Sequence, residues 1–407
     1  MNGGRNDDRR VVIVYDLGAA VPVDILTSLH GVAAPVFVLP DSAYGRRIAT
    51  MLDGIAEVAG EHELAELEPD GITTFSDFQM DTTARLAESL GLPFHSTEVA
   101  ADITRKFRQR RVLNDAGVGG TPTALITDRV SALRALDEVP LPAVLKPNRG
   151  VGGRNTYLVE SREQLLRLVG EHIGGVVCAD DDGYVLEKRM VGQPADEPWA
   201  GYVSVESMVR SGVVTHLGIT GKFALSPPFR EHGGFVPPRP GQFDEDVLFE
   251  FAARALTALG IRDGVCHTEI MLTADGPEII EVNGRSGGNI YDLFLRGHGV
   301  NLIELGVRIA LGDTPEVAPR TPEEVVFHYF GLAPLSARRL TAVPGLENVR
   351  AMPEVSRLDL NVPPGAELDW RRGFRERVYS CRGSVPSHGE LAGFLPTMRR
   401  TLDARYD

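Results

Sequence analysis

The chain has 407 residues, of which 43% are apolar and 24% charged, and it carries a net charge of −14 at pH 7. This length predicts about two or three domains, and the acidic balance argues against a nucleic-acid partner, because a phosphate backbone needs a basic surface. The sequence contains no apolar run of about 18 residues that would predict a membrane span. The three cysteines, Cys178, Cys266 and Cys381, are scattered. They fit no disulfide framework or metal spacing, so a cytoplasmic location is expected.

The first part of the chain alternates strand-like and helix-like patterns over residues 11–95, which predicts a small parallel α/β domain. VVIVY, PVFVLP and GITTFS are its predicted strands. DTTARLAESLGL is a predicted helix with Asp81 at its N-cap and Gly91 near its end. Asp16 and Asp24 interrupt the first apolar run, which favours a buried strand over a signal peptide.

The middle of the chain begins with a helix predicted over 104–116. PAVLKPNRGVGGRNTYLVE follows as strand, glycine loop and strand, and YVLEKRM and YVSVESMV are predicted strands. Residues 226–240 hold five prolines and two glycines, which predicts an irregular binding loop. Two later helices are predicted to end at Gly260 and Gly312, the second capped by Asn301. Beyond them lies a smaller α+β tail.

Two apolar strands near residue 275 carry charge on one face. In PEIIEVNGRSGG, Glu281, Asn283 and Arg285 stand at every second position and therefore point the same way. CHTEIML precedes this strand, and a three-residue turn over 274–276 would pair Leu272 with Glu278 and Glu269 with Glu281. Two carboxylates would then stand directly opposite each other, which destabilises a strand pair.

A divalent cation would remove this conflict between the carboxylates. Glu281 could bridge two ions, with Glu269 on one and Asn283 on the other, and all-oxygen ligands suit Mg²⁺. Arg285 could hold an anion beside the ions. A solvated strand face is the alternative for Glu281 alone, but the four residues together favour the metal.

The stretch VLKPNRGVGG offers a place for phosphates. Gly150, Gly152 and Gly153 allow backbone N–H groups to approach an anion, and Lys146 can supply a point charge. The lysine precedes the glycines, so the stretch is no Walker loop. A tight turn beside an exposed lysine explains the pattern equally well, and a lone helix lysine such as Lys106 is usually solvated.

The order of these pieces resembles the ATP-grasp superfamily of carboxylate–amine ligases, in particular the amino-acid ligases. The matching stretches are TRKFRQRRVLNDAGV, VLKPNRGVGG, YVLEKRM, YVSVE, GITGKF, TEIML and EIIEVNGRSGG. The resemblance implies an α/β and α+β protein in three parts: an N-terminal α/β domain over 1–100, a two-subdomain ATP-grasp domain over 101–312, and a C-terminal α+β domain over 313–407.

The resemblance also implies roles for individual residues. ATP would be bound by Lys106, Lys146, Gly150, Gly152, Gly153, Glu187, Lys188, Arg189 and Met190. Mg²⁺, as two ions and with Mn²⁺ as the alternative, would be bound by Glu269, Glu281 and Asn283. The substrate would lie against Glu231, His232, Arg285, Gly287 and Gly288, with Arg285 and Lys146 as the catalytic residues. Relatives often carry a histidine where this chain has Gly234.

The implied activity is ATP-dependent amide formation through an acyl phosphate. By resemblance, the substrates would be a small-molecule carboxylate, expected to be an amino acid, and an amine that is free or on a carrier protein. A homodimer is expected only by analogy with relatives. A biotin-carboxylase-like or purine-type carboxylase that activates bicarbonate is one alternative, although the chain lacks a biotin-attachment MKM sequence. A non-catalytic ATP-binding module is the other.

Overall fold

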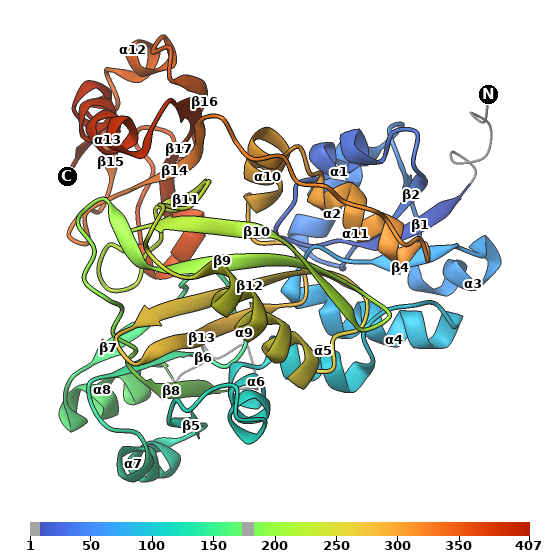
Figure 1. Ribbon diagram of the computed structural model, residues 1–407, viewed down its shortest axis with the longest axis horizontal. Coiled ribbons are helices and arrows are strands. Elements are labelled where there is room, and N and C mark those ends of the chain that lie inside the picture. Colours follow the sequence, from blue (N-terminus) through green and yellow to red (C-terminus); the bar gives the residue numbers. More distant parts are fainter. Residues whose placement is uncertain (1–8, 173–182) are drawn as a thin grey trace.

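The structure is a computed structural model that describes residues 9–172 and 183–407. Its long central strands lie between the N-terminal sheet, a small sheet formed near residues 123–188, and the C-terminal helices (Figure 1). Cys266 and Cys381 are buried free thiols, whereas Cys178 lies outside the described residues. The described helices include none that is long and apolar enough to cross a membrane.

The N-terminal sheet is parallel, as the sequence predicts. Residues Val11–Val14 of its central strand are almost fully buried, which is expected where helices cover both faces of a parallel sheet. The strand order is β3-β2-β1-β4. The strands are β1 (Arg10–Val14), β2 (Ala34–Val38), β3 (Glu57–Val58) and β4 (Gly71–Thr73), and the helices are α1 (Pro22–Leu29), α2 (Ala43–Leu52), α3 (Leu64–Leu67) and α4 (Met80–Leu90), with 3₁₀ turns η1 (Glu61–Glu63) and η2 (Asp77–Gln79).

Two helix boundaries differ from the prediction. Helix α4 begins at Met80 because η2 runs directly into it, so Asp81 lies in the first turn instead of at the N-cap; Gly91 ends the helix with φ +65°, as expected. The helix predicted over 104–116 begins two residues later than expected, because the backbone of Arg105 is extended. It is α6 (Lys106–Asp115), and a separate helix, α5 (Thr97–Thr104), ends just before it.

A small antiparallel sheet follows, with strand order β5-β8-β6-β7. Its inner face packs apolar residues against two helices. The strands are β5 (Thr123–Ile126), β6 (Ala143–Pro147), β7 (Tyr157–Val159) and β8 (Tyr184–Lys188), and the helices are α7 (Arg129–Glu138) and α8 (Arg162–His172).

The largest sheet in the described chain is antiparallel and has the order β13-β12-β9-β10-β11-β14-β17-β16. Strands from beyond residue 312 extend it, so the domain boundary proposed there falls within one continuous sheet. Its strands are β9 (Trp199–Arg210), β10 (Val213–Phe223), β11 (Gly233–Val236), β12 (Gly264–Thr273), β13 (Gly276–Asn283), β14 (Val325–Leu332), β16 (Val355–Leu360) and β17 (Arg377–Val385).

The remaining elements pack against this sheet or against the N-terminal one. Helix α11 is capped by Asn301 as predicted and contacts β4 and α1. These elements are α9 (Glu245–Ala258), α10 (Ile290–His298), α11 (Leu302–Ala310), α12 (Leu346–Arg350), α13 (His388–Leu402), η3 (Trp370–Glu376), β15 (Leu340–Ala342) and β18 (Arg405–Tyr406).

The segment 226–240 is not wholly irregular, which corrects the prediction. Its prolines fall on either side of residues 233–236, which form β11 between β10 and β14. Phe235 and Val236 are buried there, and Gly233 has φ +94°, where a Cβ would lie 2.1 Å from the carbonyl oxygen of His328.

The turn between β12 and β13 also differs from the prediction. Thr273 pairs with Gly276, so the turn is one residue shorter than expected, and Glu278 lies opposite Met271. The predicted pairing of Leu272 with Glu278 is therefore wrong.

A bulge in β13 restores the register that matters for the site. Ile279 pairs with Ile270, and Glu281 pairs with Glu269, so Ile280 is the extra residue. The bulge lets Ile279 and Val282 both pack in the core, which regular alternation would not allow at a spacing of three. The opposed pair of Glu269 and Glu281 is thus present as predicted.

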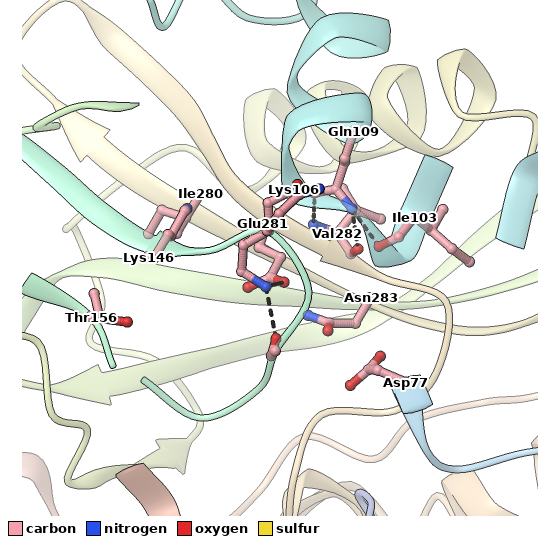
Figure 2. Close-up of polar contacts among 12 residues, drawn as sticks. Asp77, Ile103, Lys106, Gln109, Lys146, Thr156, Ile280, Glu281, Val282 and Asn283 are labelled. Carbon is pink, nitrogen blue, oxygen red and sulfur yellow. Dashed lines mark hydrogen bonds and ion pairs between the residues drawn. The ribbon is translucent and has the colours of Figure 1, made fainter. Parts of the chain in front are cut away.

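Helix α6 covers the free edge of β13. Gln109 donates to the carbonyl of Val282 at 2.7 Å and accepts from its N–H at 2.8 Å. Arg110 donates to the carbonyls of Ile279 and Ile280 at 2.5 and 2.8 Å. Figure 2 shows Gln109 reaching β13 one helical turn beyond Lys106. The backbone groups of an edge strand are therefore satisfied by side chains instead of a neighbouring strand.

Replacing Gln109 by methionine is expected to lower the stability of the protein by about 2–4 kcal/mol, because the N–H and C=O of Val282 lose their partner in a buried position. The free energy of unfolding in urea measures this loss. Gln193 is a matched control, since it donates to the strand carbonyl of Thr273 at 3.0 Å but is exposed. Equal losses in Gln109→Met and Gln193→Met would contradict the capping role.

Candidate active site

A cavity of about 590 Å³ is lined by residues of both antiparallel sheets, a size typical of small-molecule sites. Most residues that the sequence singles out line it. They are Lys106, Lys146, Gly150, Gly152, Gly153, Glu187, Lys188, Arg189, Met190, Glu231, Glu269, Glu281, Asn283, Arg285 and Gly288.

Two predicted substrate residues do not line this cavity. The ring of His232 stacks on Tyr329, and its nitrogens contact Ser226 Oγ and the carbonyl oxygen of Phe330, both at 2.7 Å. Gly287 packs against His267, whose Nδ1 would lie 2.6 Å from a Cβ. Both residues have packing roles in the structure.

The opposed carboxylates of Glu269 and Glu281 are each held by cationic neighbours at one oxygen. Lys106 Nζ lies 2.7 Å from Glu281 Oε1 (Figure 2). His267 Nε2 and Lys222 Nζ lie 3.3 and 3.7 Å from Glu269 Oε1. Burial alone would raise the pKa of Glu269, but the hydrogen bond from His267 and the charge of Lys222 lower it. Glu269 is therefore ionised at neutral pH.

The donor set at this pair fits a divalent cation that prefers oxygen. The Oε2 atoms of Glu269 and Glu281 accept no hydrogen bond from any described residue, and Asn283 lies next to Glu281 on β13 (Figure 2). Two carboxylate oxygens and one amide oxygen are ligands that Mg²⁺ accepts when water and phosphate complete its shell. No group of three or more His, Cys, Asp or Glu side chains within the described ranges is placed to hold a metal without such additional ligands.

His267 is in turn oriented by Glu206 on β9, whose carboxylate oxygens lie 2.8 and 2.9 Å from its Nδ1. Burial lowers the pKa of His267, but the Glu206 carboxylate outweighs burial and raises it to about 9. The imidazole is therefore a cation beside Glu269.

Lys146 is fixed by a buried ion pair. Its Nζ lies 2.7 Å from Glu187 Oε2, and Arg110 Nε lies 3.2 Å from the other oxygen of the same carboxylate. Burial would raise the pKa of Glu187, but Arg110 and Lys146 lower it to about 2. The carboxylate of Glu187 thus has two protein partners, and it positions Lys146 at the cavity wall.

The glycine loop is folded over the cavity. Gly152 and Gly153 have φ of +64° and +71°, and Asn155, at +48°, adopts the left-handed geometry that the sequence allows. The carbonyl of Gly150 accepts from Lys106 Nζ at 2.8 Å, and the carbonyl of Gly152 accepts from the N–H of Phe374 at 3.1 Å. The loop is therefore fastened both to α6 and to η3.

The strand end after β8 leaves the backbone N–H of Met190 available at the cavity. The N–H groups of Lys188 and Arg189 donate to the carbonyls of Pro122 and Pro142, both at 3.0 Å. The N–H of Met190 has no acceptor among the described residues. A planar heterocycle that accepts a hydrogen bond could dock at this position.

Arg285 is held by the N-terminal part of the chain. Its guanidinium contacts Asp77, with Nε at 2.8 Å from Oδ2, and Nη2 lies 3.2 Å from Asn283 Oδ1. Asp77 lies in η2, which follows the parallel sheet. The N-terminal part therefore supplies a wall of the cavity, in which both residues take part.

Sequence reasoning missed several charged residues around the site, namely Asp77, Arg110, Glu206, Lys222, His267 and Arg377. Two carried a usable signal. His267 stands two residues before Glu269 and so shares its face, and Lys222 is a lone charge in an apolar strand. The others lie in segments whose local pattern indicates nothing about the cavity.

Comparisons with known proteins agree with this geometry. The chain is 26% identical over 340 residues to the uncharacterized protein y4rH of Sinorhizobium fredii, which covers 82% of this chain and 67% of that protein. It is 26% identical over 349 residues to human carnosine synthase 1 and 24% identical over 249 residues to alanine–anticapsin ligase of Bacillus subtilis. These matches cover 80% and 58% of this chain but only 41% and 52% of the two ligases. No protein-family model matches the chain.

Solved structures match over nearly the whole chain. The L-amino acid ligase from Bacillus licheniformis superposes with a TM-score of 0.73 at 20% identity, over 98% of this chain and 99% of that one. The biotin carboxylase domain of the Hydrogenobacter thermophilus 2-oxoglutarate carboxylase gives 0.68 at 17% identity, over 98% and 90%. The chain therefore has the ATP-grasp fold, and its sequence is similar to those of carboxylate–amine ligases.

Proposed function

We propose that the protein is an ATP-dependent ligase that joins a carboxylate to an amine and has an amino acid as one substrate. The observation that carries this proposal is the opposed pair of Glu269 and Glu281 in one cavity with Lys146 and the glycine loop. A non-catalytic binding module would have no need to keep two carboxylates opposed at the cost of their repulsion. The names of the related ligases support an amino acid as substrate.

Within this proposal, ATP lies between the two antiparallel sheets. Its adenine would accept from the N–H of Met190, and its phosphates would lie under the glycine loop between Lys106 and Lys146. Glu269, Glu281 and Asn283 would hold Mg²⁺, which neutralises charge on the phosphates and orients them. Because Lys106 bridges Glu281 and the carbonyl of Gly150, it links the metal ligands to the loop.

The reaction would proceed in two steps. An oxygen of the substrate carboxylate attacks the γ-phosphorus of ATP, the bond to the β,γ-bridging oxygen breaks, and ADP leaves. The amine nitrogen then attacks the acyl carbon, the acyl–oxygen bond breaks, and inorganic phosphate and one proton are released with the amide. Arg285 would orient the carboxylate and stabilise charge that develops on its oxygens. The glycine loop would exclude water from the acyl phosphate.

Glu231 is the proposed partner of the substrate ammonium group. Burial raises the pKa of its carboxyl, and the charge of Glu269 raises it further, while Lys222 and Arg377 oppose this. An ammonium group beside Glu231 would offset the repulsion from Glu269. This need for a cation agrees with an α-amino acid as the activated substrate.

The test is release of ADP and phosphate with Mg²⁺-ATP across the twenty amino acids, singly and in pairs, with mass spectrometry of the product. The expected result is equal release of ADP and phosphate that requires an amino acid, together with a product whose mass equals the two substrates less one water. Omission of Mg²⁺ should abolish it. ADP release that depends on bicarbonate alone would favour a carboxylase, and failure to bind ATP would refute the proposal.

A further inference from the structure

The guanidinium of Arg377 lines the cavity and forms no ion pair with any described residue. Its central carbon lies 3.4 Å from the centre of the Phe330 ring and 5.6 Å from that of Phe374. Among the described residues, no side chain or carbonyl makes a hydrogen bond or ion pair with it. Burial lowers its pKa to about 10. A desolvated cation without a partner is costly, so this position is built to receive an anion.

A bulge in β17 turns Arg377 toward the cavity. Gly331 pairs with Tyr379, and Leu332 pairs with Arg377, so Val378 is the extra residue. Without it, Arg377 would share the face of Tyr379, which packs in the C-terminal core. With the bulge it joins the cavity face, and bulges commonly re-aim side chains beside functional sites.

The neighbours of Arg377 on this face add positive charge and spare donors. His328 on β14 and Arg382 on β17 are cross-strand partners, and both line the cavity. Both ring nitrogens of His328 are buried without a hydrogen-bond partner. Arg382 pairs with Asp292 at 3.1 Å, and Asp292 also holds Arg296 at 2.8 Å.

Two acidic groups near Arg377 are already engaged by other cations, whereas Glu231 acts on Arg377 through its charge without forming an ion pair. Asp292 serves two arginines, and Asp359 pairs with Arg357 at 2.7 Å. Among the described cations at this end, Arg377 therefore has no carboxylate in ion-pair contact.

Two cations flank two neighbouring carboxylates across the cavity. The charge of Arg285 acts on Glu269, that of Glu269 acts on Glu231, and Glu231 in turn lies within the field of Arg377. In the proposed reaction the activated carboxylate occupies the Arg285 end and its ammonium group lies at Glu231. Arg377 acts on Glu231 but is not among the charges that act on Glu269, so a carboxylate bound at Arg377 would be separate from the carboxylate at Arg285.

We propose that Arg377 binds a carboxylate carried by the amine substrate, so that the acceptor is itself an amino acid or another amine that bears an acid. This inference rests on the proposed ligase function and specifies its second substrate. The stacked guanidinium is pre-oriented for two parallel hydrogen bonds to a planar carboxylate.

The test uses pairs of amino acids that give turnover, in which each partner is replaced in turn by its carboxamide. The neutral carboxamide of the acceptor is expected to lower kcat/KM at least about 30-fold in the wild type, as loss of one partner of a buried charge pair does. In Arg377→Met, the kcat/KM values for the acceptor acid and for its carboxamide should differ less than about 3-fold. Arg377→Lys should retain part of the preference, and KM for ATP and for the donor should not change.

Arg239 provides a matched control, because it stacks on Trp199 at 5.3 Å but does not line the cavity. Arg239→Met should keep the wild-type preference. Wild-type protein that uses acceptor carboxamides as well as acids would overturn the inference while leaving the ligase function intact. A preference that depends on a second carboxylate of the donor would also overturn it.

A binding measurement tests Arg377 without turnover. Calorimetric titration of the protein with MgADP and each of the twenty amino acids should find at least one whose binding is lost in its carboxamide and in Arg377→Met. If amino acids bind but none shows this loss, or if none binds, the inference is refuted. Absence of turnover in every pair would separately refute the proposed function for these substrates.

Discussion

Exchange of Glu281 for glutamine is expected to lower ADP release by at least about 100-fold, the scale on which loss of one preorganised electrostatic group reduces turnover. The substitution removes the charge that opposes Glu269 and holds Lys106 at 2.7 Å, while it keeps the shape of the side chain. The side chain is 24% exposed, so the fold should tolerate the change. Steady-state ADP release, with circular dichroism to verify folding, measures the effect.

Glu278 is the matched control for Glu281. It lies on the same strand, does not line the cavity, and accepts from Thr121 Oγ1 at 3.3 Å. Glu278→Gln should keep turnover within about 2-fold of wild type, as expected for a change outside the site. Turnover above one tenth of wild type in Glu281→Gln would argue that the opposed carboxylates are no metal site.

Exchange of Glu187 for glutamine is expected to destabilise the protein by about 3–5 kcal/mol at pH 7, because it leaves Arg110 and Lys146 as buried cations without their carboxylate. Lys146 would also lose the contact that positions it, so ATP binding should weaken. Urea unfolding and titration with MgADP measure the two effects.

This loss of stability should depend on pH in a specific direction. The pKa of Glu187 is raised by burial but lowered overall, from 4.5 to about 2, by Arg110 and Lys146. A lowered pKa means that the ionised group stabilises the fold fully above about pH 4.5, and that this contribution declines as the pH falls toward 2. The stability difference between wild type and Glu187→Gln should therefore be largest at neutral pH and shrink below pH 4.5.

The exposed Glu160 offers a control for the pH series, since Glu160→Gln should follow the wild type throughout. A difference between wild type and Glu187→Gln that stays constant from pH 7 to pH 3 would show that the carboxylate is not held ionised by its two partners.

Local patterns in the sequence predicted the parallel sheet, the strand pair and the residues that share its charged face, because alternation and burial act over a few residues. Bulges escaped prediction. The predicted turn was one residue too long, and the extra residue in β13 compensates for this difference. Glu269 and Glu281 are therefore paired as predicted, but through a bulge that the sequence pattern did not indicate. The bulge in β17 hid Arg377 altogether, since plain alternation assigns it to the core.

Side chains that reach the site from distant segments were also beyond local reasoning. Asp77 meets Arg285 across 208 positions of sequence, and Arg110 meets Glu187 across 77. An arginine on a solvated helix face and an arginine that is buried against a strand have the same local sequence pattern. Only the tertiary fold distinguishes Arg110, which is 2% exposed, from an ordinary surface arginine.

The contacts of helix α6 have a consequence for how the chain folds. Lys106, Gln109 and Arg110 find their partners on β13 after separations of 175, 173 and 169 residues. During synthesis this helix therefore emerges long before the strand that completes it, with polar groups that water must satisfy in the meantime. Contacts between residues so far apart in sequence form slowly, because the intervening chain loses conformational entropy before the contacts stabilise the fold. The proposed nucleotide site should consequently be among the last regions to gain protection from hydrogen exchange during refolding.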